Sequence, residues 1–314
     1  MKTTRFFLAI AAILFLLEGE IAAMERESVQ FVEDRLIKNG SVSVDVSMMN
    51  MQELVNEIAW KEPGALYASI KNYLAYTYNP HRYGLDSLEP MIDTVNKVAK
   101  VVLLLHGAGG GPYTFLDWAK EYERVGITNV YTVDLQQTDD DPVPLHQITE
   151  KIRSIASQCF SAGAEVVDLS LQGHSLGALV ASKYVWRAEP FDDRVSVSMF
   201  ISIGGRLHYD DCQFSWFCEG VRPEIEQTYD EYVKNPLKVD LYTVWGAMDG
   251  IVPKESVHIQ GFPDRELSVE DCGHLGIMYA RQAIDQAAQW TKQWTQNNQT
   301  ITPILNKSTF SKYP

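Results

Sequence analysis

A glycine-serine-glycine pattern directly after an apolar-rich run constrains the fold of this chain more than any other feature. The run spans 166–171, and Gly173, Ser175 and Gly177 follow it at alternate positions before a helix-like pattern begins. This arrangement is typical of a tight strand-to-helix turn, which strains the backbone of its central residue and exposes its side chain. A Cβ atom at either glycine would collide with neighbouring backbone.

The central serine of this turn would lie at the N-terminus of a helix. Free N–H groups at that end of a helix favour developing negative charge. We therefore expect Ser175 to be a nucleophile. The alternative is a plain glycine-rich turn, and the choice depends on whether the rest of the chain supplies a base, an acid and oxyanion donors.

Apolar runs and helix-like patterns alternate along most of the chain. Continuous apolar runs are typical of strands that are buried on both faces. Their alternation with helices predicts a mostly parallel sheet with helices on both faces, an α/β fold. Besides the strand before Ser175, strands are expected over 101–105, 129–133, 195–203, 241–244 and 266–269, and helices over 113–125, 145–160, 253–257 and 276–294.

Composition divides the chain into four segments. Lys2 and Arg5 precede an apolar run over 6–17, and the small residue Ala23 follows. This is typical of a secretory signal peptide at 1–23. The run is shorter than the ~20 residues that span a bilayer, so we expect a secreted or periplasmic protein, with an uncleaved anchor as the alternative. A helical extension is expected over 24–100, the main α/β domain over 101–297 and a polar tail over 298–314.

Two segments are rich in apolar residues but carry no motif. In the extension, apolar residues fall on one helical face over 48–58, 66–74 and 88–95. Packing is their expected role, and binding of an apolar ligand is the alternative. The segment 206–236 is irregular and aromatic, so we expect a lid or cap excursion whose aromatic side chains line an apolar pocket or only pack.

The net charge of −14 argues against a nucleic-acid partner, because phosphate binding needs a basic face. It is compatible with a neutral or apolar substrate. None of the four cysteines has metal-binding spacing, and neither a metal nor a cofactor is expected. Cys212 and Cys218 are close enough for a small disulfide loop in an oxidising compartment, with free thiols as the alternative. The acidic triplet at 139–141 could bind a hard cation, although a solvated loop is favoured.

A glycine-rich loop, 106–111, follows the first strong strand, and ligands of such sheets bind beyond the carboxyl ends of the strands. The loop lacks the Lys-Ser/Thr ending of a phosphate-binding loop and does not match the dinucleotide fingerprint. We expect the backbone N–H groups of Ala108 and Leu176 to form an oxyanion hole instead, each donor contributing on the order of 3 kcal/mol. His106, Gly107 and His174 are expected to support this loop and the serine turn.

An acid and a base follow the serine in chain order. Asp249 comes just beyond a predicted strand, and His274 lies between a short strand and the last helix. The order Ser, Asp, His is the one that this type of turn requires. His274 would take the proton of Ser175, and Asp249 would orient the imidazole. Asp210 and Asp211, after the preceding strand, are rival acids.

The chain from 101 to 294 resembles an α/β-hydrolase of the lipase and esterase kind. The resemblance rests on the segments 102–113, 167–178, 245–253 and 273–276. It maps an oxyanion donor onto Ala108, which follows the His-Gly pair. Ala178 stands where the family usually has a second glycine, and the extension has no counterpart that we recognise.

This resemblance implies hydrolysis of carboxylic esters through an acyl-serine intermediate, without a cofactor. It does not fix the acyl chain or the alcohol, so the expected substrate is a small-molecule or lipid ester. The aromatic stretch over 209–232 favours a lipid-like ester, and with it peripheral contact with a membrane or lipid interface. A thioesterase or amidase with the same three residues is an alternative. A binding protein that has kept the fold without the chemistry is another, because fold does not determine function.

Overall fold

The computed structural model of the chain describes residues 62–78, 90–136, 141, 143–188, 191–207, 215–235, 238–257 and 263–297. All of them belong to one compact unit. Several predictions lie outside the described residues: the signal peptide at 1–23, the helical face at 48–58, most of the acidic triplet at 139–141, the rival acids Asp210 and Asp211, the pairing of Cys212 with Cys218, and the polar tail at 298–314.

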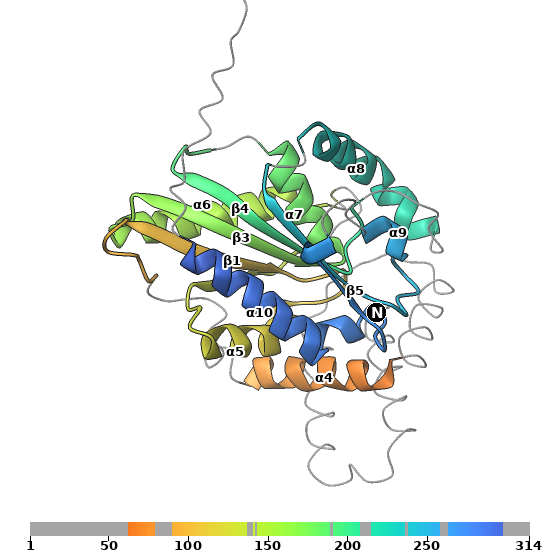
Figure 1. Cartoon of the computed structure of the whole chain (residues 1–314). Coiled ribbons are helices and arrows are strands. Elements are labelled where there is room, and N and C mark those ends of the chain that lie inside the picture. Colours follow the sequence, from red (N-terminus) through yellow and green to blue (C-terminus); the bar gives the residue numbers. More distant parts are fainter. Residues whose placement is uncertain are drawn as a thin grey trace, which may run out of the picture. The chain divides into compact units, whose positions relative to one another are not determined.

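A parallel sheet of six strands forms the centre of the described structure (Figure 1). Every pair of neighbouring strands is parallel, in the order β2-β1-β3-β4-β5-β6. Parallel strands point their carboxyl ends at the same edge, so the loops after β1, β3, β5 and β6 converge there. The strands are β1 (Val98–Leu105), β2 (Val130–Val133), β3 (Val166–His174), β4 (Val195–Ile203), β5 (Asp240–Gly246) and β6 (Glu266–Val269).

Helices cover both faces of this sheet (Figure 1). One layer consists of α5 (Leu116–Arg124) and α10 (Arg281–Gln296), and the other contains α6 (Leu145–Ser161) and α7 (Leu176–Arg187). A further helix, α8 (Ser215–Lys234), packs against α7. None of the helices in the described residues is long and apolar enough to cross a membrane.

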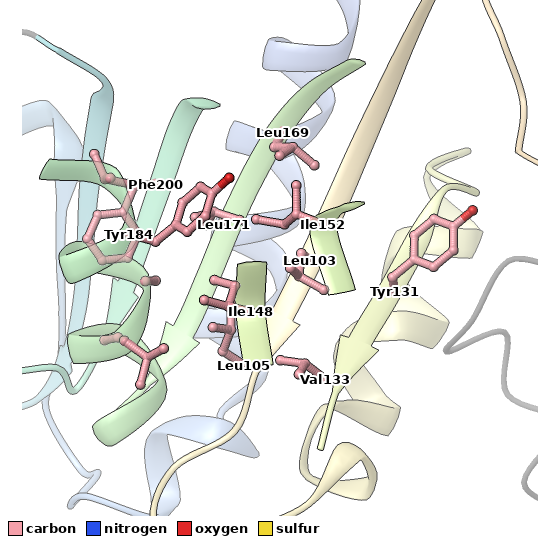
Figure 2. Packing of buried hydrophobic residues seen from close by; sticks show 14 of the residues in the cluster. Leu103, Leu105, Tyr131, Val133, Ile148, Ile152, Leu169, Leu171, Tyr184 and Phe200 are labelled. Carbon is pink, nitrogen blue, oxygen red and sulfur yellow. The ribbon is translucent and has the colours of Figure 1, made fainter. Parts of the chain in front are cut away.

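The side chains of β1 alternate between these two layers. Leu103 and Leu105 pack with Ile148 and Ile152 of α6 (Figure 2), whereas Leu104 lies in the cluster beneath α5 and α10. All of them are fully buried. Because both faces of the strand are covered, a continuous apolar run is stable here, and burial of one leucine side chain contributes ~1.5–3 kcal/mol.

The helix α4 (Pro63–Tyr78) lies next to the loops at the carboxyl edge of the sheet. It contacts two short 3₁₀ helices, η2 (Pro112–Phe115) after β1 and η4 (Gly276–Met278) before α10. The rings of Tyr73 and Tyr113 meet edge to face, with centroids 5.1 Å apart. The helix confirms that the segment 66–74 is helical, as predicted.

Most of the predicted elements of the sheet domain are present. The bounds of β4 and β6 are the predicted ones, whereas β1 begins at Val98 instead of residue 101. The predicted helix over 276–294 is wrong at its start, because it consists of η4 followed by α10, which begins at Arg281. Ala280 between them has an extended backbone (φ −71°, ψ 117°), which interrupts the helix.

The prediction of an irregular segment over 206–236 is wrong for most of its length. Residues Ser215–Lys234 form the single helix α8, with Pro223 inside it. Proline usually breaks a helix, because it lacks an N–H group and its ring clashes with the preceding turn. The packing of α8 against α7 outweighs that local preference.

The predicted helical face over 88–95 is wrong in its described part. Residues 90–97 form no helix, and the side chain of Asp93 accepts the backbone N–H groups of Val95 and Asn96 in a tight turn. Met91 and Val95, which were expected to face the core, are exposed. Local hydrogen bonding by aspartate competes with helix formation, which explains the difference.

Candidate active site

The turn between β3 and α7 has an unusual backbone at its centre. Ser175 has φ 53° and ψ −118°, a region that residues with a side chain rarely adopt. A Cβ on Gly173 would overlap the backbone nitrogen of Ala178, and one on Gly177 would overlap the carbonyl oxygen of Leu105. Glycine is therefore required on both sides of the serine, because the turn brings its own backbone and that of β1 too close for a side chain.

Ser175 lies within hydrogen-bond distance of His274, which in turn contacts Asp249. The Nε2 atom of His274 is 2.9 Å from Ser175 Oγ, and Nδ1 is 2.7 Å from Asp249 Oδ2. A carboxylate only accepts hydrogen bonds, so Nδ1 carries the proton and Nε2 is free to accept the serine hydroxyl. Both the Asp249 and the His274 side chains are nearly buried, at 2% and 9% exposed.

Asp249 is held by the loop in which it stands. Its Oδ1 atom accepts the backbone N–H groups of Ile251 at 2.8 Å and Val252 at 2.9 Å, which leaves Oδ2 for His274. Burial alone would raise the pKa of this carboxyl, but the His274 charge and these hydrogen bonds lower the pKa below its usual value. Asp249 is therefore ionised at neutral pH.

The environment of His274 favours its protonated form. Burial disfavours the imidazolium, but Asp249 outweighs that effect through its charge and its hydrogen bond, so the pKa of His274 lies above the usual 6.5. A neutral imidazole in this position can take a proton from Ser175, and the ionised carboxylate stabilises the imidazolium that results.

His174, which immediately precedes the serine, contacts the backbone of the base loop. Its Nε2 donates to the carbonyl oxygen of His274 at 2.9 Å, and the two rings lie with centroids 4.9 Å apart. Burial, reinforced by the nearby His274, lowers the pKa of His174 to about 3. The side chain is thus neutral and joins the serine turn to the loop that carries His274.

The glycine-rich loop after β1 lies directly against the serine turn. A Cβ on Gly107 would be 3.0 Å from Ser175 Cβ and 2.9 Å from His174 Nδ1. The carbonyl oxygen of Gly107 accepts hydrogen bonds from Gly110 N–H at 3.1 Å and from His106 Nδ1 at 2.8 Å. His106 can donate through Nδ1 because its Nε2 accepts the backbone N–H of Leu135.

Ala108 follows Gly107 and is exposed, whereas Leu176 is buried at the first position of α7. The N–H group of a first helical residue has no intrahelical acceptor. The carbonyl oxygen of Ser175 accepts the N–H groups of the third and fourth residues of the helix region, Ala178 and Leu179. The N–H group of Leu176 is therefore available to a ligand oxygen beside Ser175.

A small cavity opens next to Ser175 and is mostly apolar. Leu176 and Leu179 of α7 form one wall, and Val221 and Ile225 of α8 form another. The remaining lining residues are Arg206, Ile251 and Val252.

The aromatic residues of 206–236 were expected either to line an apolar pocket or only to pack, and those that are described do not line this cavity. The rings of Tyr229 and Tyr232 of α8 lie tilted with centroids 6.0 Å apart, and Tyr232 packs against Trp186 of α7 with ring centroids 5.2 Å apart. Their role is packing, and the cavity is aliphatic instead.

Glu62 is a residue of the site that the sequence did not reveal. It precedes α4, and its carboxylate accepts the backbone N–H groups of Leu275 and Gly276, next to His274. No motif marks it, because its partners are more than 200 residues away. Within the described parts of the chain, His, Cys, Asp and Glu side chains form no group of three suited to a metal ion. Cys159 and Cys272 are free thiols.

The parallel sheet, with a serine on the sharp turn after its central strand β3 and a histidine after β6, defines the α/β-hydrolase fold. No protein-family model and no curated protein matches the chain. Solved structures of the same fold do match it.

The chain is similar to an esterase of Pyrobaculum calidifontis, with 13% identity and a TM-score of 0.49, covering 62% of this chain and 76% of that one. It is also similar to an esterase of Pyrococcus furiosus, with 17% identity and a TM-score of 0.39, covering 63% of this chain and 85% of that one. A lipase-esterase related protein of Clostridium acetobutylicum has 13% identity and a TM-score of 0.38, covering 62% and 93%.

Proposed function

We propose that the protein is a serine hydrolase that cleaves carboxylic esters through an acyl-serine intermediate. The observation that carries the proposal is the chain of contacts from Ser175 through His274 to Asp249, at 2.9 Å and 2.7 Å. These residues are in the order and orientation that a serine nucleophile needs, with the base held by an ionised acid.

In the first half-reaction, Ser175 Oγ attacks the ester carbonyl carbon while its proton passes to His274 Nε2. The carbonyl electron pair moves onto oxygen, and the N–H groups of Ala108 and Leu176 stabilise that oxyanion. Removal of one such donor typically costs about 10²–10³ in kcat. Collapse of the tetrahedral intermediate breaks the bond to the alcohol, which leaves with the proton from His274.

In the second half-reaction, water attacks the acyl-Ser175 ester. His274 takes one proton from this water, and the same N–H groups stabilise the second oxyanion. Collapse breaks the bond to Ser175 Oγ, which regains the proton from His274, and the carboxylic acid is released. The enzyme returns to its starting state, so no cofactor is consumed.

The acyl chain of the substrate is expected to occupy the cavity beside Ser175. Val221, Ile225 and Leu179 give it an aliphatic lining, and apolar pockets bind apolar groups by removing their surface from water. A lipid-like ester fits this chemistry better than a charged one. Peripheral contact with a lipid interface, and export directed by 1–23, are part of the proposal.

The test is hydrolysis of p-nitrophenyl esters of increasing acyl chain length, with matched thioesters and amides alongside. We expect ester turnover that is abolished by Ser175→Ala and kept by Ser157→Ala, the same change on the exposed side of α6. A fluorophosphonate probe followed by mass spectrometry should label Ser175 and report the mature N-terminus. Turnover in Ser175→Ala equal to that of the parent would refute the proposal, and faster thioester or amide cleavage would change the substrate class.

A further inference from the structure

Glu62 contacts the loop that carries His274 from a distant part of the chain. Its Oε1 atom accepts a hydrogen bond from the backbone N–H of Leu275 at 3.3 Å, and its Oε2 atom accepts one from the N–H of Gly276. Both donors follow His274 directly. On the other side, the carbonyl oxygen of His274 accepts a hydrogen bond from His174. The backbone that sets the position of the imidazole is thus held from both sides.

Two glycines leave room for this carboxylate. A Cβ on Gly273 or on Gly276 would overlap the side chain of Glu62. The segment 273–276 therefore forms a binding site for the carboxylate, which we call the seat. It leaves space for the two oxygens, and the N–H groups of Leu275 and Gly276 donate to them. The contacts among Ser175, His274 and Asp249 do not require a glycine at position 276. The need for space beside the Glu62 carboxylate explains why a glycine is present there.

The helix that follows Glu62 is anchored independently of the carboxylate. The Tyr73 ring of α4 packs on Tyr113 of η2, and Asn72 Nδ2 donates to Asp117 Oδ2 at 3.1 Å. Asn72 is buried. Since η2 follows the glycine-rich loop, α4 links the segment after that loop to the loop of His274. The position of Glu62 therefore rests on packing as well as on its own hydrogen bonds.

The charged and titratable groups around the His274 ring come from four elements. Asp249 stands after β5, Arg206 after β4, His174 in β3 and Glu62 before α4. Burial disfavours the imidazolium most strongly. Asp249 and then Glu62 favour it, and Arg206 opposes it, with a raised pKa of His274 as the result. His174 is held neutral by its burial.

We propose that Glu62 is a positioning residue for His274. Its carboxylate, seated between Gly273 and Gly276, fixes the loop of the base and adds a second negative charge to the surroundings of the imidazole. This inference rests on the proposed function, in which His274 is the base. It assigns to Glu62, which lies just before α4, a part in the chemistry of a site that is otherwise built from the loops of the sheet.

The first test compares Glu62→Gln and Glu62→Ala with Glu123→Gln, which removes one exposed negative charge from α5. Glu62→Gln keeps the size of the side chain but loses its charge and one acceptor oxygen. In the Glu62→Gln variant, we expect the acid limb of the pH profile of kcat/KM to move to lower pH. Glu62→Ala should lower kcat about tenfold with little change in KM, since small displacements of a catalytic group are costly. Glu123→Gln should change neither.

A second variant displaces the carboxylate without changing any charge. Gly276→Ala places a methyl group in the seat, so it should reproduce the loss of kcat seen for Glu62→Ala. The double variant Glu62→Ala/Gly276→Ala should be no worse than either single variant, because residues that act through one contact are not additive. Additive losses would show that the two positions act separately and would overturn the inference.

A third measurement does not depend on turnover. Titration of the His274 imidazole by NMR should give a lower pKa in Glu62→Gln than in the parent and in Glu123→Gln. Thermal unfolding shows whether each variant folds. If Glu62→Ala or Gly276→Ala does not fold, the pH profile of Glu62→Gln and the titration of its His274 test the inference instead. Parent-like kcat, pH profile and His274 pKa in Glu62→Gln would overturn this inference and leave ester hydrolysis intact. Absence of hydrolysis in the parent, with no probe label on Ser175, would instead refute the proposed function.

Discussion

His174 and His274 lie with their ring centroids 4.9 Å apart, and their surroundings move their pKa values in opposite directions. Burial without an acidic partner lowers the pKa of His174 to about 3. His274 is buried as well, but its contact with Asp249 raises its pKa. One ring therefore serves as a neutral hydrogen-bond donor to the backbone, and the other is suited to accept a proton.

The neutral His174 predicts an acid-sensitive fold. Its pKa is about 3 in the folded state and ~6.5 in the unfolded state, so the unfolded chain binds more protons between these values. Stability should thus fall as the pH drops from 6.5 towards 3, by an amount on the order of a few kcal/mol. Urea unfolding should show that the free energy of unfolding falls less between pH 7 and pH 5 in His174→Gln than in the parent, because glutamine does not titrate. Equal losses in both proteins would contradict the prediction.

The raised pKa of His274 predicts the acid limb of the pH–rate profile. The base must be neutral to accept a proton, so kcat/KM should fall as the pH drops through the pKa of the free enzyme. Because that pKa is raised, the midpoint should lie above 6.5. Its contribution to stability has the opposite sign to that of His174, being present at low pH and lost as the pH rises through the folded value. An acid midpoint well below 6.5 would rule out this assignment.

Asp249→Asn tests the acid of the proposed triad. The amide cannot stabilise the imidazolium, and its NH₂ group favours the wrong tautomer of His274, so kcat should fall by about 10⁴. The residual acid limb should also move to lower pH. The matched control is Asp240→Asn at the start of β5, where the carboxylate is 58% exposed and pairs with Arg265. Comparable activity in the two variants would exclude Asp249.

Val221→Phe tests whether the cavity beside Ser175 binds the acyl chain. Val221 is buried and lines that cavity, whereas Val233 on the same helix is 58% exposed. The larger side chain should reduce turnover of long-chain esters much more than that of acetate esters. Val233→Phe, the same substitution on the same helix, should leave the ratio unchanged. An unchanged chain-length profile in Val221→Phe would place the acyl chain elsewhere.

Gly177→Ala tests the close packing of the serine turn against β1. The added Cβ would overlap the carbonyl oxygen of Leu105, and such overpacking typically costs about 1–3 kcal/mol. Both the melting temperature and the activity should fall. Gly64→Ala is the control, since a Cβ on Gly64 meets nothing within 4 Å. That change in α4 should be neutral or stabilising by up to ~1 kcal/mol. A stable, active Gly177→Ala variant would contradict the geometry.

Local sequence was sufficient for the parts of the fold that repeat a simple pattern. The strand predicted over 101–105 is the buried half of β1, because a parallel strand covered on both faces needs an uninterrupted apolar run. The spacing of Gly173, Ser175 and Gly177 predicted the turn after β3 for an equally local reason. Local patterns failed where packing overrides them, as at Pro223 within α8 and at Ala280 before α10.

The sequence by itself determined the layered α/β architecture and the glycine-flanked serine, because both follow from the periodicity of apolar residues and from steric limits on the backbone. It also brought Asp249 and His274 forward as candidates, since each stands beyond a strand. Only the tertiary structure decided the distances among them, the aliphatic wall from α8 and the contact of Glu62 with the loop of His274. Such contacts join residues up to 214 positions apart, and no local pattern encodes which distant groups a folded chain brings together.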